Sequence, residues 1–209
     1  KVIFHMRRLR ENTELNSSEA YSSMFLQRKI VGVDWFDSLR WDSLIKRFKG
    51  GKFIDLGCLD SLCPLMVKRR FPDSEAWGLD QAEDAIHALS RECPEVNYVV
   101  GDVYKTNLPA GYFDYAVAGE LIEHLEKPED FFVEAFRILR SGGILALSPP
   151  KEETEAGEVD GKRHLWSYTR EDIKEMMQLY CSYVKIGTLG SKYFPQYRYH
   201  FPYIIAFGT

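Results

Sequence analysis

The stretch that decides the fold is KFIDLGCLDSLCPLMVKRR, residues 52–70. Its apolar start predicts a strand over residues 52–56, and its end predicts a helix over residues 62–70. DLGCLDSLC, Asp55–Cys63, lies between them and predicts a tight turn. A strand, a tight turn and a helix in this order form the layout that cradles a nucleotide-like ligand.

The turn differs from the usual nucleotide-binding turn in its glycines. It contains one glycine, Gly57, whereas Leu59 and Ser61 occupy positions where further glycines are expected. Close approach of a ligand requires glycine only where φ is positive or where a Cβ would strike the ligand. We therefore expect Gly57 to be that position, and Leu59 and Ser61 to keep ordinary backbone angles. Asp60 is expected to shape the turn through a local hydrogen bond.

Strands and helices alternate beyond this turn. The alternation predicts an α/β fold, a doubly wound, mostly parallel sheet with helices on both faces. Further strands are expected over residues 75–80, 96–102, 113–120 and 144–148, and helices over residues 82–92 and from Pro128 to Ser141. Two helices, over residues 17–30 and 34–48, are expected before the alternation. After Ser148 the sequence predicts a polar loop, a helix that opens with the capping box Thr169–Asp172, and two late strands.

Composition limits the classes of function. The 209 residues suit one domain with a full core, and the net charge of −4 does not suit broad nucleic-acid binding, which depends on neutralising phosphates. The four cysteines match no zinc or disulfide spacing, and we expect buried, reduced thiols at Cys58 and Cys63. No segment is predicted to cross a membrane and no signal peptide is recognised, so a cytoplasmic location is expected.

Polar side chains at the carboxyl ends of four expected strands mark the candidate site, because ligands of parallel sheets bind there. The four ends are Asp55–Leu59, Asp80–Gln81, Gly101–Val103 and Gly119–Glu120. The start of the helix after the first strand offers N–H groups for a carboxylate or phosphate. Asp80 suits two ribose hydroxyls, and Asp102 can accept a hydrogen bond from the exocyclic amine of a base.

The most specific pattern in the chain is FDYAVAGELIEHLEKPEDFFVEAFRILRSGGILALSPP, residues 113–150. It resembles, nearly position by position, the fD…E.iEHl..P..fl.E..RiLrpGG.l..s.P signature of the class I S-adenosylmethionine-dependent methyltransferases. RHLWSYTREDI, residues 163–173, is similar to the stretch that opens the fifth helix of that family. The resemblance implies a seven-stranded Rossmann-like sheet with an antiparallel last strand, S-adenosylmethionine as methyl donor and S-adenosylhomocysteine as product.

The resemblance also implies roles for the strand ends. The turn after the first strand would wrap the methionine part of the cofactor, Asp80 would bind the ribose, and Asp102 with Val103 would frame the adenine. The implied cofactor-binding residues are Asp55, Gly57, Cys58, Leu59, Asp80, Gln81, Asp102, Val103, Gly119 and Glu120. We expect one methyltransferase domain over residues 1–209, with N-terminal helices (1–50), a cofactor-binding core (51–150) and a substrate-side loop, helix and strands (151–209).

Two histidines are candidates for the base that removes a proton from the methyl acceptor. His124 lies in ELIEHL next to the expected cofactor strand, and His164 precedes the helix that starts at Thr169. The alternative is that His124 caps or packs near its helix and that His164 is a surface-loop residue.

A metal is a second possibility for these residues. Glu120, Glu123 and His124 stand at i, i+3 and i+4, so they would share one helix face, and with His164 they could ligate a divalent ion. This set resembles the metal ligands of small-RNA 2′-O-methyltransferases and some ubiquinone-pathway O-methyltransferases. The same letters occur in many metal-free relatives, and we assign no metal from the sequence.

The methyl acceptor is expected to be a small molecule, methylated at oxygen or nitrogen. Trp166, Tyr168, Tyr193 and Tyr197 are candidate substrate residues, because aromatic side chains suit a planar or sugar-like ligand. Two alternatives remain open, an RNA-end 2′-O-methyltransferase with a divalent metal and a protein that keeps the fold without catalysis. Neither a nucleic acid nor a membrane is expected as a partner, and the acceptor and the oligomeric state are not predicted.

Overall fold

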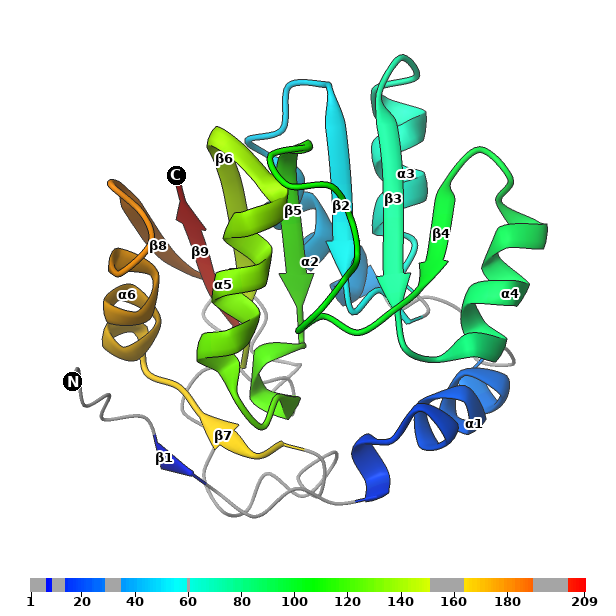
Figure 1. Cartoon of the computed structure of the whole chain (residues 1–209), viewed down its shortest axis with the longest axis horizontal. Helices are drawn as coiled ribbons and strands as arrows, with labels where there is room; N and C mark the ends of the chain where they lie inside the picture. The colour runs from blue at the N-terminus through cyan, green and yellow to red at the C-terminus, as the bar shows by residue number, and fades with distance from the viewer. Residues whose placement is uncertain (1–6, 9–13, 29–34, 60, 151–163, 190–202) are drawn as a thin grey trace.

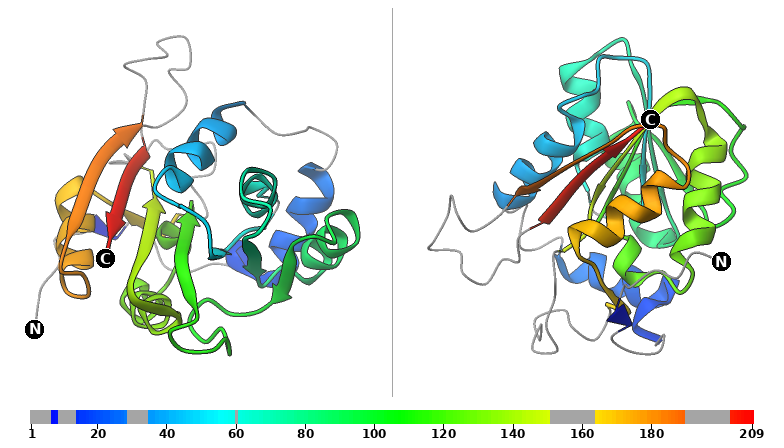
Figure 2. Two further views of the ribbon diagram at one scale, coloured as in Figure 1. Left: turned by 90° about the horizontal axis from the view of Figure 1, so that it is seen from above. Right: turned by 90° about the vertical axis from the view of Figure 1, so that its left-hand side faces the viewer.

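The computed structural model describes residues 7–8, 14–28, 35–59, 61–150, 164–189 and 203–209. In these residues one twisted sheet forms the middle layer and helices cover both of its faces (Figures 1 and 2). A separate two-stranded sheet pairs β1 (Arg7–Arg8) with β7 (Trp166–Ser167), which the sequence did not predict.

The main sheet has seven strands in the order β4-β3-β2-β5-β6-β9-β8. Neighbouring strands from β4 to β6 are parallel, whereas β9 runs antiparallel to both β6 and β8. The predicted doubly wound sheet with an antiparallel last strand is therefore confirmed. The strands are β2 (Lys52–Leu56), β3 (Glu75–Asp80), β4 (Asn97–Val100), β5 (Phe113–Gly119), β6 (Leu139–Ser148), β8 (Val184–Leu189) and β9 (Tyr203–Gly208).

Two apolar clusters attach the helices to the sheet. On one face Phe132 of α5 and Met176 of α6 pack with side chains of the strands, and on the other face Trp41 of α2 and Val67 of α3 do so. A third cluster joins Phe25 of α1 to alanines at the start and along one side of α4. The helices are α1 (Ser18–Arg28), α2 (Trp35–Ile45), α3 (Cys63–Arg70), α4 (Glu83–Glu92), α5 (Pro128–Ile138) and α6 (Arg170–Gln178), with 3₁₀ turns η1 (Glu14–Asn16) and η2 (Ile122–His124).

Local sequence signals account for several element ends. Thr169 and Asp172 form the predicted capping box at the start of α6, each accepting a hydrogen bond from the backbone N–H of the other. All four cysteines are buried and free, as predicted for Cys58 and Cys63. Among the described residues no helix has the length and apolar character needed to cross a membrane.

Two expected boundaries were wrong. The helix expected to reach Ser141 ends at Ile138, and the strand expected from residue 144 begins at Leu139. Leu139 pairs with Phe113 before the register of the β5–β6 pair shifts, so pairing with β5 takes this segment out of the helix. The stretch expected to be helical before Pro128 forms only the short turn η2.

The fold brings the carboxyl ends of β2, β3, β4 and β5 to one edge of the sheet, because these strands are parallel neighbours. In Figure 1 the arrowheads of the central strands point toward α1 and the β1–β7 pair. These elements come from the N-terminal part of the chain and from the segment before α6. Residues distant in sequence therefore meet at the edge where a ligand is expected.

Candidate active site

A cavity of about 320 Å³ lies at this edge of the sheet. All ten residues predicted to bind the cofactor line it, together with side chains from η1, α1, α2 and η2. The lining residues are Asn16, Tyr21, Arg40, Trp41, Leu44, Asp55, Gly57, Cys58, Leu59, Ser61, Asp80, Gln81, Gly101, Asp102, Val103, Tyr104, Gly119, Glu120, Leu121, His124, Leu125 and Glu126. The structure therefore brings the four predicted strand ends together in one place.

The turn after β2 contains two left-handed residues. Gly57 has φ +73°, where a side chain is strained, and a Cβ built on it would lie 2.7 Å from Cδ1 of Leu121 and displace that side chain. Leu59 has φ +36°, so the expectation of ordinary backbone angles at this residue was wrong. Its N–H donates to Asp80 Oδ2 at 2.8 Å and its side chain packs beside the α1–α4 cluster, contacts that hold the strained angle. The predicted role of Asp60 lies outside the described residues.

Asp80 joins two turns of the site. Its carboxylate is 7 % exposed and accepts two backbone hydrogen bonds of 2.8 Å, one from Leu59 N and one from Ala82 N. Oδ2 accepts the bond from Leu59 N and Oδ1 the bond from Ala82 N, so the carboxylate links the turn after β2 to the start of α4. Asp80 thus has a structural role beside the predicted binding role.

The backbone donors of the first turn are already used. Gly57 N and Cys58 N both donate to Leu79 O, at 2.8 and 3.0 Å, and Leu59 N donates to Asp80. These three bonds leave open the expectation for the start of the following helix, α3, which begins at Cys63.

A buried carboxylate and a buried guanidinium lie in the cavity wall near this turn. Asp55 is 4 % exposed, and burial raises its pKa to about 7, although a hydrogen bond with Ser61 and the charge of Arg40 act in the opposite direction. Arg40, on α2, is 7 % exposed, and a Cβ built on Gly119 would lie 2.5 Å from its NH1 atom. The sequence analysis did not identify Arg40. A basic residue directly before Trp41, in a helix with an apolar face, is a pattern that could have suggested a buried cation.

Asp102 and Val103, the residues predicted to frame the adenine, lie in a turn at which Asp102 is exposed. Asp102 Oδ1 accepts a hydrogen bond of 2.8 Å from Tyr104 N, which holds this turn closed, and the neighbouring Val103 is buried. Tyr104 also lines the cavity, and its hydroxyl accepts a hydrogen bond from Lys127 N. A tyrosine two residues beyond an expected strand end carries no distinctive pattern in the sequence.

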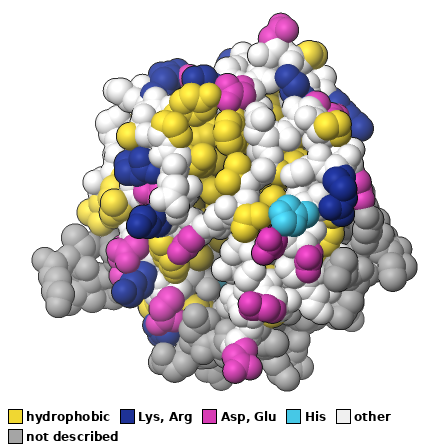
Figure 3. All heavy atoms as spheres, turned by 45° about the vertical axis from the view of Figure 1, so that its right-hand side comes forward, with side chains coloured by type: hydrophobic (Ala, Val, Ile, Leu, Met, Phe, Trp, Pro, Cys, Tyr) yellow, Lys and Arg dark blue, Asp and Glu magenta, His cyan; other side chains and the backbone are white. Residues whose placement is uncertain are grey.

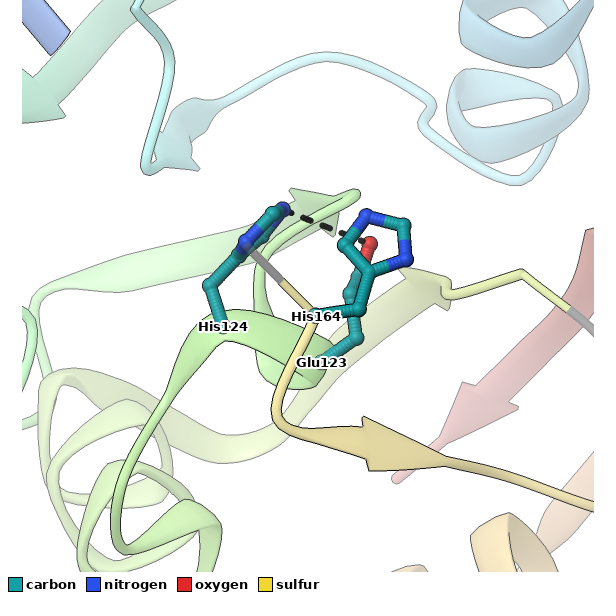
Figure 4. A group of neighbouring side chains, drawn as sticks. All are labelled: Glu123, His124 and His164. Carbon is teal, nitrogen blue, oxygen red and sulfur yellow. Dashed lines mark ion pairs between the residues drawn. The ribbon is translucent and has the colours of Figure 1, made fainter. Parts of the chain in front are cut away.

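The segment after β5 does not form the helix on which the metal hypothesis relied. Glu120 has φ +52° and lies outside η2, so Glu120, Glu123 and His124 do not share a helix face. The structure instead gathers Glu123, His124 and His164, and one ligand atom of each lies within 4.8 Å of the others (Figure 4). Glu120 lines the cavity but is not part of this group.

The two predicted histidines are neighbours with different access to the cavity. Their ring centroids are 4.6 Å apart in an edge-to-face arrangement, and the Nε2 atom of His124 lies 3.9 Å from Oε1 of Glu123. His124 lines the cavity, whereas His164 is 5 % exposed and is not among the lining residues. The alternative reading of His164 as a surface-loop residue was therefore wrong. Leu165 N donates to Glu123 O at 2.7 Å and fixes the two segments together.

Neither of the two predicted substrate residues that the structure describes, Trp166 and Tyr168, lines the cavity. Tyr168 is fully buried in the core and its hydroxyl donates to Ile122 O at 3.1 Å, so its assignment to substrate was wrong. Trp166 is half-buried, its Nε1 donates to Leu125 O at 2.7 Å, and the guanidinium of Arg8 stacks over its ring. Both side chains instead tie η2 to the segment before α6. Tyr193 and Tyr197 lie outside the described residues.

Comparison with known proteins supports the resemblance to methyltransferases. A family described as "Methyltransferase domain" matches residues 54–147, which span the site from β2 to β6. Residues 54–147, slightly less than half of the chain, are therefore similar to a methyltransferase domain, as the pattern over residues 113–150 predicted. This similarity agrees with the sheet order, and it supports S-adenosylmethionine as the cofactor.

Individual methyltransferases are similar to this chain at lower identity. A trans-aconitate 2-methyltransferase of Azoarcus sp. (strain BH72) is 26 % identical over 102 residues, which cover 49 % of this chain and 40 % of that protein. A probable S-adenosylmethionine-dependent methyltransferase of Mycolicibacterium smegmatis is 34 % identical over 77 residues, 37 % of this chain and 30 % of that protein. The chain thus matches less than half the length of either relative. A crystal structure of a methyltransferase from Archaeoglobus fulgidus has a TM-score of 0.68 at 17 % identity and covers 90 % and 99 % of the two chains, which supports the fold.

Proposed function

We propose that this chain binds S-adenosylmethionine in the cavity and transfers its methyl group to an oxygen or nitrogen of a small-molecule acceptor. The observation that carries the proposal is the meeting of four strand ends in one cavity, with Asp55 and Arg40 in one part of its wall and His124 in another. This arrangement offers a charged place for an amino-acid group and a separate place for a reacting hydroxyl or amine.

The residues present fit the charges of the cofactor. Asp55 suits the ammonium of its methionine part and Arg40 suits the carboxylate. Arg40 is buried in the cavity wall and supplies a positive charge there. Asp80 lines the cavity and suits the ribose hydroxyls, and Val103 offers an apolar surface for the adenine.

The sulfonium of S-adenosylmethionine supplies a methyl group that is already activated. The protein therefore has to hold the acceptor in line with the S–CH₃ bond and keep water out. His124 accepts the proton of the acceptor hydroxyl or amine, whose electron pair forms the new bond to the methyl carbon. The electrons of the old bond return to sulfur and leave S-adenosylhomocysteine. Buried His164 lies against His124 and positions its ring.

The charges around the cavity favour a small acceptor over an RNA. Glu120 and Glu126 line the part of the cavity that contains His124, and carboxylates there repel phosphates. On the face shown in Figure 3, Asp and Glu side chains gather over the lower central part, whereas Lys and Arg lie mostly toward the top and the sides. The name of the Azoarcus relative also specifies a small-molecule substrate for that protein.

Isothermal titration calorimetry with S-adenosylmethionine tests the proposal. We expect one binding site in the wild type and a loss of about 1.5–3 kcal/mol of binding free energy in Asp80→Ala, because a hydrogen bond to a charged group is removed. Arg40→Gln should also weaken binding, because the cofactor carboxylate loses its cation.

Asp84→Ala, on the exposed side of α4, is the matched control and should bind like the wild type. Since Asp80 also holds two backbone N–H groups, each variant is checked for cooperative unfolding before its affinity is interpreted. No heat from the wild type at millimolar cofactor would refute the proposal and favour a non-catalytic protein. Salt-dependent binding of RNA ends by the wild type would favour the RNA alternative.

A further inference from the structure

We propose that the methylated atom is the nitrogen of a small-molecule amine, which binds as a cation at the acceptor end of the cavity. The acceptor end is the part of the lining formed by Tyr21, Tyr104, Glu120, His124 and Glu126. The assignment rests on the proposed function and chooses between the oxygen and nitrogen acceptors that the proposed function leaves open. The charges and partners of the side chains at this end carry it.

Two carboxylates at the acceptor end keep oxygens that the described part of the chain does not engage. Glu120 is half-buried directly after β5, and none of the described residues donates a hydrogen bond to its carboxylate or forms an ion pair with it. Glu126 Oε1 accepts a hydrogen bond of 2.7 Å from Arg8 NH2, whereas its Oε2 is buried and has no hydrogen-bond partner among the same residues. A carboxylate oxygen shielded from water is costly until a donor reaches it. A ligand N–H supplies that donor once the carboxylate turns toward the cavity.

The sign of the charge selects the acceptor class. Among the described residues that line the cavity, Arg40 is the one Lys or Arg side chain, and the proposed function assigns it to the cofactor carboxylate. Arg8 approaches the acceptor end from outside the lining, where it already pairs with Glu126 and lies 5.0 Å from the centroid of the Trp166 ring. An anionic acceptor would therefore meet carboxylates without a cation of the described lining to receive it, whereas an ammonium meets opposite charge.

Two tyrosine rings complete the acceptor end and also suit a cation. Tyr21, on α1, packs edge-to-face against His124 with 6.1 Å between the ring centroids. Burial raises the pKa of Tyr104, and the charges of Asp102 and Glu126 add to the rise, although backbone hydrogen bonds act in the opposite direction. The negative charge of this end thus acts on a ring of its own wall. Aromatic rings attract organic cations, and the carboxylates add opposite charge.

The movement of charge during the reaction also favours nitrogen. The bound ammonium gives one proton to His124, and the lone pair of the neutral amine forms the bond to the methyl carbon while the S–C electron pair returns to sulfur. The positive charge of the sulfonium thereby passes to the nitrogen of the methylated ammonium, where Glu120 and Glu126 stabilise it. A hydroxyl acceptor instead develops negative charge on oxygen as its proton leaves, and the same carboxylates oppose that charge.

Calorimetry on the protein saturated with S-adenosylhomocysteine tests the assignment with three similar probes, phenethylamine, phenethyl alcohol and phenylacetate. We expect the amine to bind at least tenfold more tightly than the alcohol, and the carboxylate to show no saturable binding at millimolar concentration. Glu120→Gln and Glu126→Gln should each lower the affinity for the amine at least tenfold and leave the affinity for the alcohol within about twofold. Glu83→Gln, with a side chain 68 % exposed on α4, is the matched control and should keep the wild-type preference.

With S-adenosylmethionine in place of the product, mass spectrometry should show methylated phenethylamine and no methylated phenethyl alcohol. The assignment is overturned if the amine shows no saturable binding, if the alcohol or the carboxylate binds as tightly as the amine, or if the alcohol is the probe that is methylated. It is also overturned if both Gln variants keep the wild-type preference. Cofactor binding without a preference for the amine overturns the nitrogen assignment alone, whereas a lack of cofactor binding refutes the proposed function as well.

Discussion

Two buried carboxylates in this fold have pKa values shifted in opposite directions. The pKa of Asp55, at the end of β2, is raised, and the pKa of Glu134, on α5, is lowered. Hydrogen bonds from Arg137 and from Thr106 lower the pKa of Glu134 to about 2 despite its burial. Burial raises the pKa of Asp55 to about 7, because Ser61 and Arg40 compensate only part of the lost solvation. Loss of solvation is the largest effect on Asp55, whereas at Glu134 the hydrogen bonds from Arg137 and Thr106 outweigh it.

The difference separates a structural group from a binding group. Glu134 accepts bonds from Thr106 N and Oγ1 and from Nε and NH2 of Arg137, at 2.5–2.8 Å, and so ties α5 to the loop after β4. Asp55 faces the cavity, where a ligand ammonium can complete its surroundings. A buried acid whose ionisation is costly in the free protein therefore marks the part of the fold that awaits a ligand.

The largest expected effect is a pH dependence of stability that comes from Asp55. Its pKa is about 7 in the folded chain against an ordinary value of 3.8, a difference worth about 4 kcal/mol. The folded state keeps this proton while the unfolded state loses it, so the contribution is complete below about pH 3.8 and is lost as the pH rises through about 7. Urea unfolding of wild type and Asp55→Asn over this range measures it.

Asp55→Asn cannot titrate, so the unfolding free energy of the wild type relative to this variant should fall as the pH rises. A constant difference over this range would contradict the assignment to Asp55. Cofactor binding gives a second test of Asp55, because the ammonium of the cofactor favours the ionised form of this carboxylate. The affinity for S-adenosylmethionine should therefore increase as the pH rises through about 7, and Asp55→Asn should lack that increase.

The second expected effect is the contribution of Glu134 to stability. It is smaller than that of Asp55 and is lost toward low pH instead of high pH. Glu134→Gln should lower the free energy of unfolding at neutral pH by about 2 kcal/mol, because the charge-assisted bonds to Arg137 are lost. The side chain of Arg137 is 38 % exposed, so solvent screening keeps the loss below what the pKa shift alone suggests. The stabilisation is present above about pH 4.5 and is lost as the pH falls through about 2.

Glu129→Gln is the matched control, since Glu129 is exposed on the same helix. It should change the unfolding free energy by less than about 1 kcal/mol. Cofactor affinity should stay within about twofold of the wild type in Glu134→Gln, since this variant keeps the volume of the side chain. A loss of affinity as large as that of Asp55→Asn would remove the distinction between the two carboxylates.

The smallest effects concern the two left-handed residues of the turn beside Asp55. Gly57→Ala should cost about 1–2 kcal/mol of stability and at least tenfold in cofactor affinity, because φ is positive and the new Cβ meets Leu121. Leu59→Gly should change stability by less than about 1 kcal/mol, because relief of backbone strain offsets lost packing. Urea unfolding and calorimetry on both variants check the pair. A large gain in affinity from Leu59→Gly would show that the glycine-poor turn impairs binding.

Several features of the fold and site could be predicted from local patterns. Alternating strand and helix signals predicted the sheet, and parallel strands place their carboxyl ends at one edge, so the strand-end residues were found together. The capping box of α6 depends on residues three apart and was equally predictable. Where a feature depends on neighbours in sequence, the pattern of residue types was sufficient.

Other features depend on contacts between distant segments. The side chain of Arg40 reaches the site because α2 packs across β5 and β6, and no periodicity within α2 specifies that neighbour. The left-handed angle of Leu59 is held by Asp80, 21 residues further along the chain. The prediction that Glu120, Glu123 and His124 share a helix face was wrong for the same reason. The carbonyl groups of η2 accept hydrogen bonds from the segment that contains His164 and Tyr168.

The order of residue types along the chain was enough to specify the methyltransferase sheet, the edge at which a ligand binds and the acidic residues placed there. The ionisation of Asp55, the closeness of Arg40 to it and the convergence of Glu123, His124 and His164 arose from packing. Secondary structure follows from periodicities within about ten residues, whereas pKa values and ligand geometry follow from burial and from charges that the folded chain brings within a few ångströms.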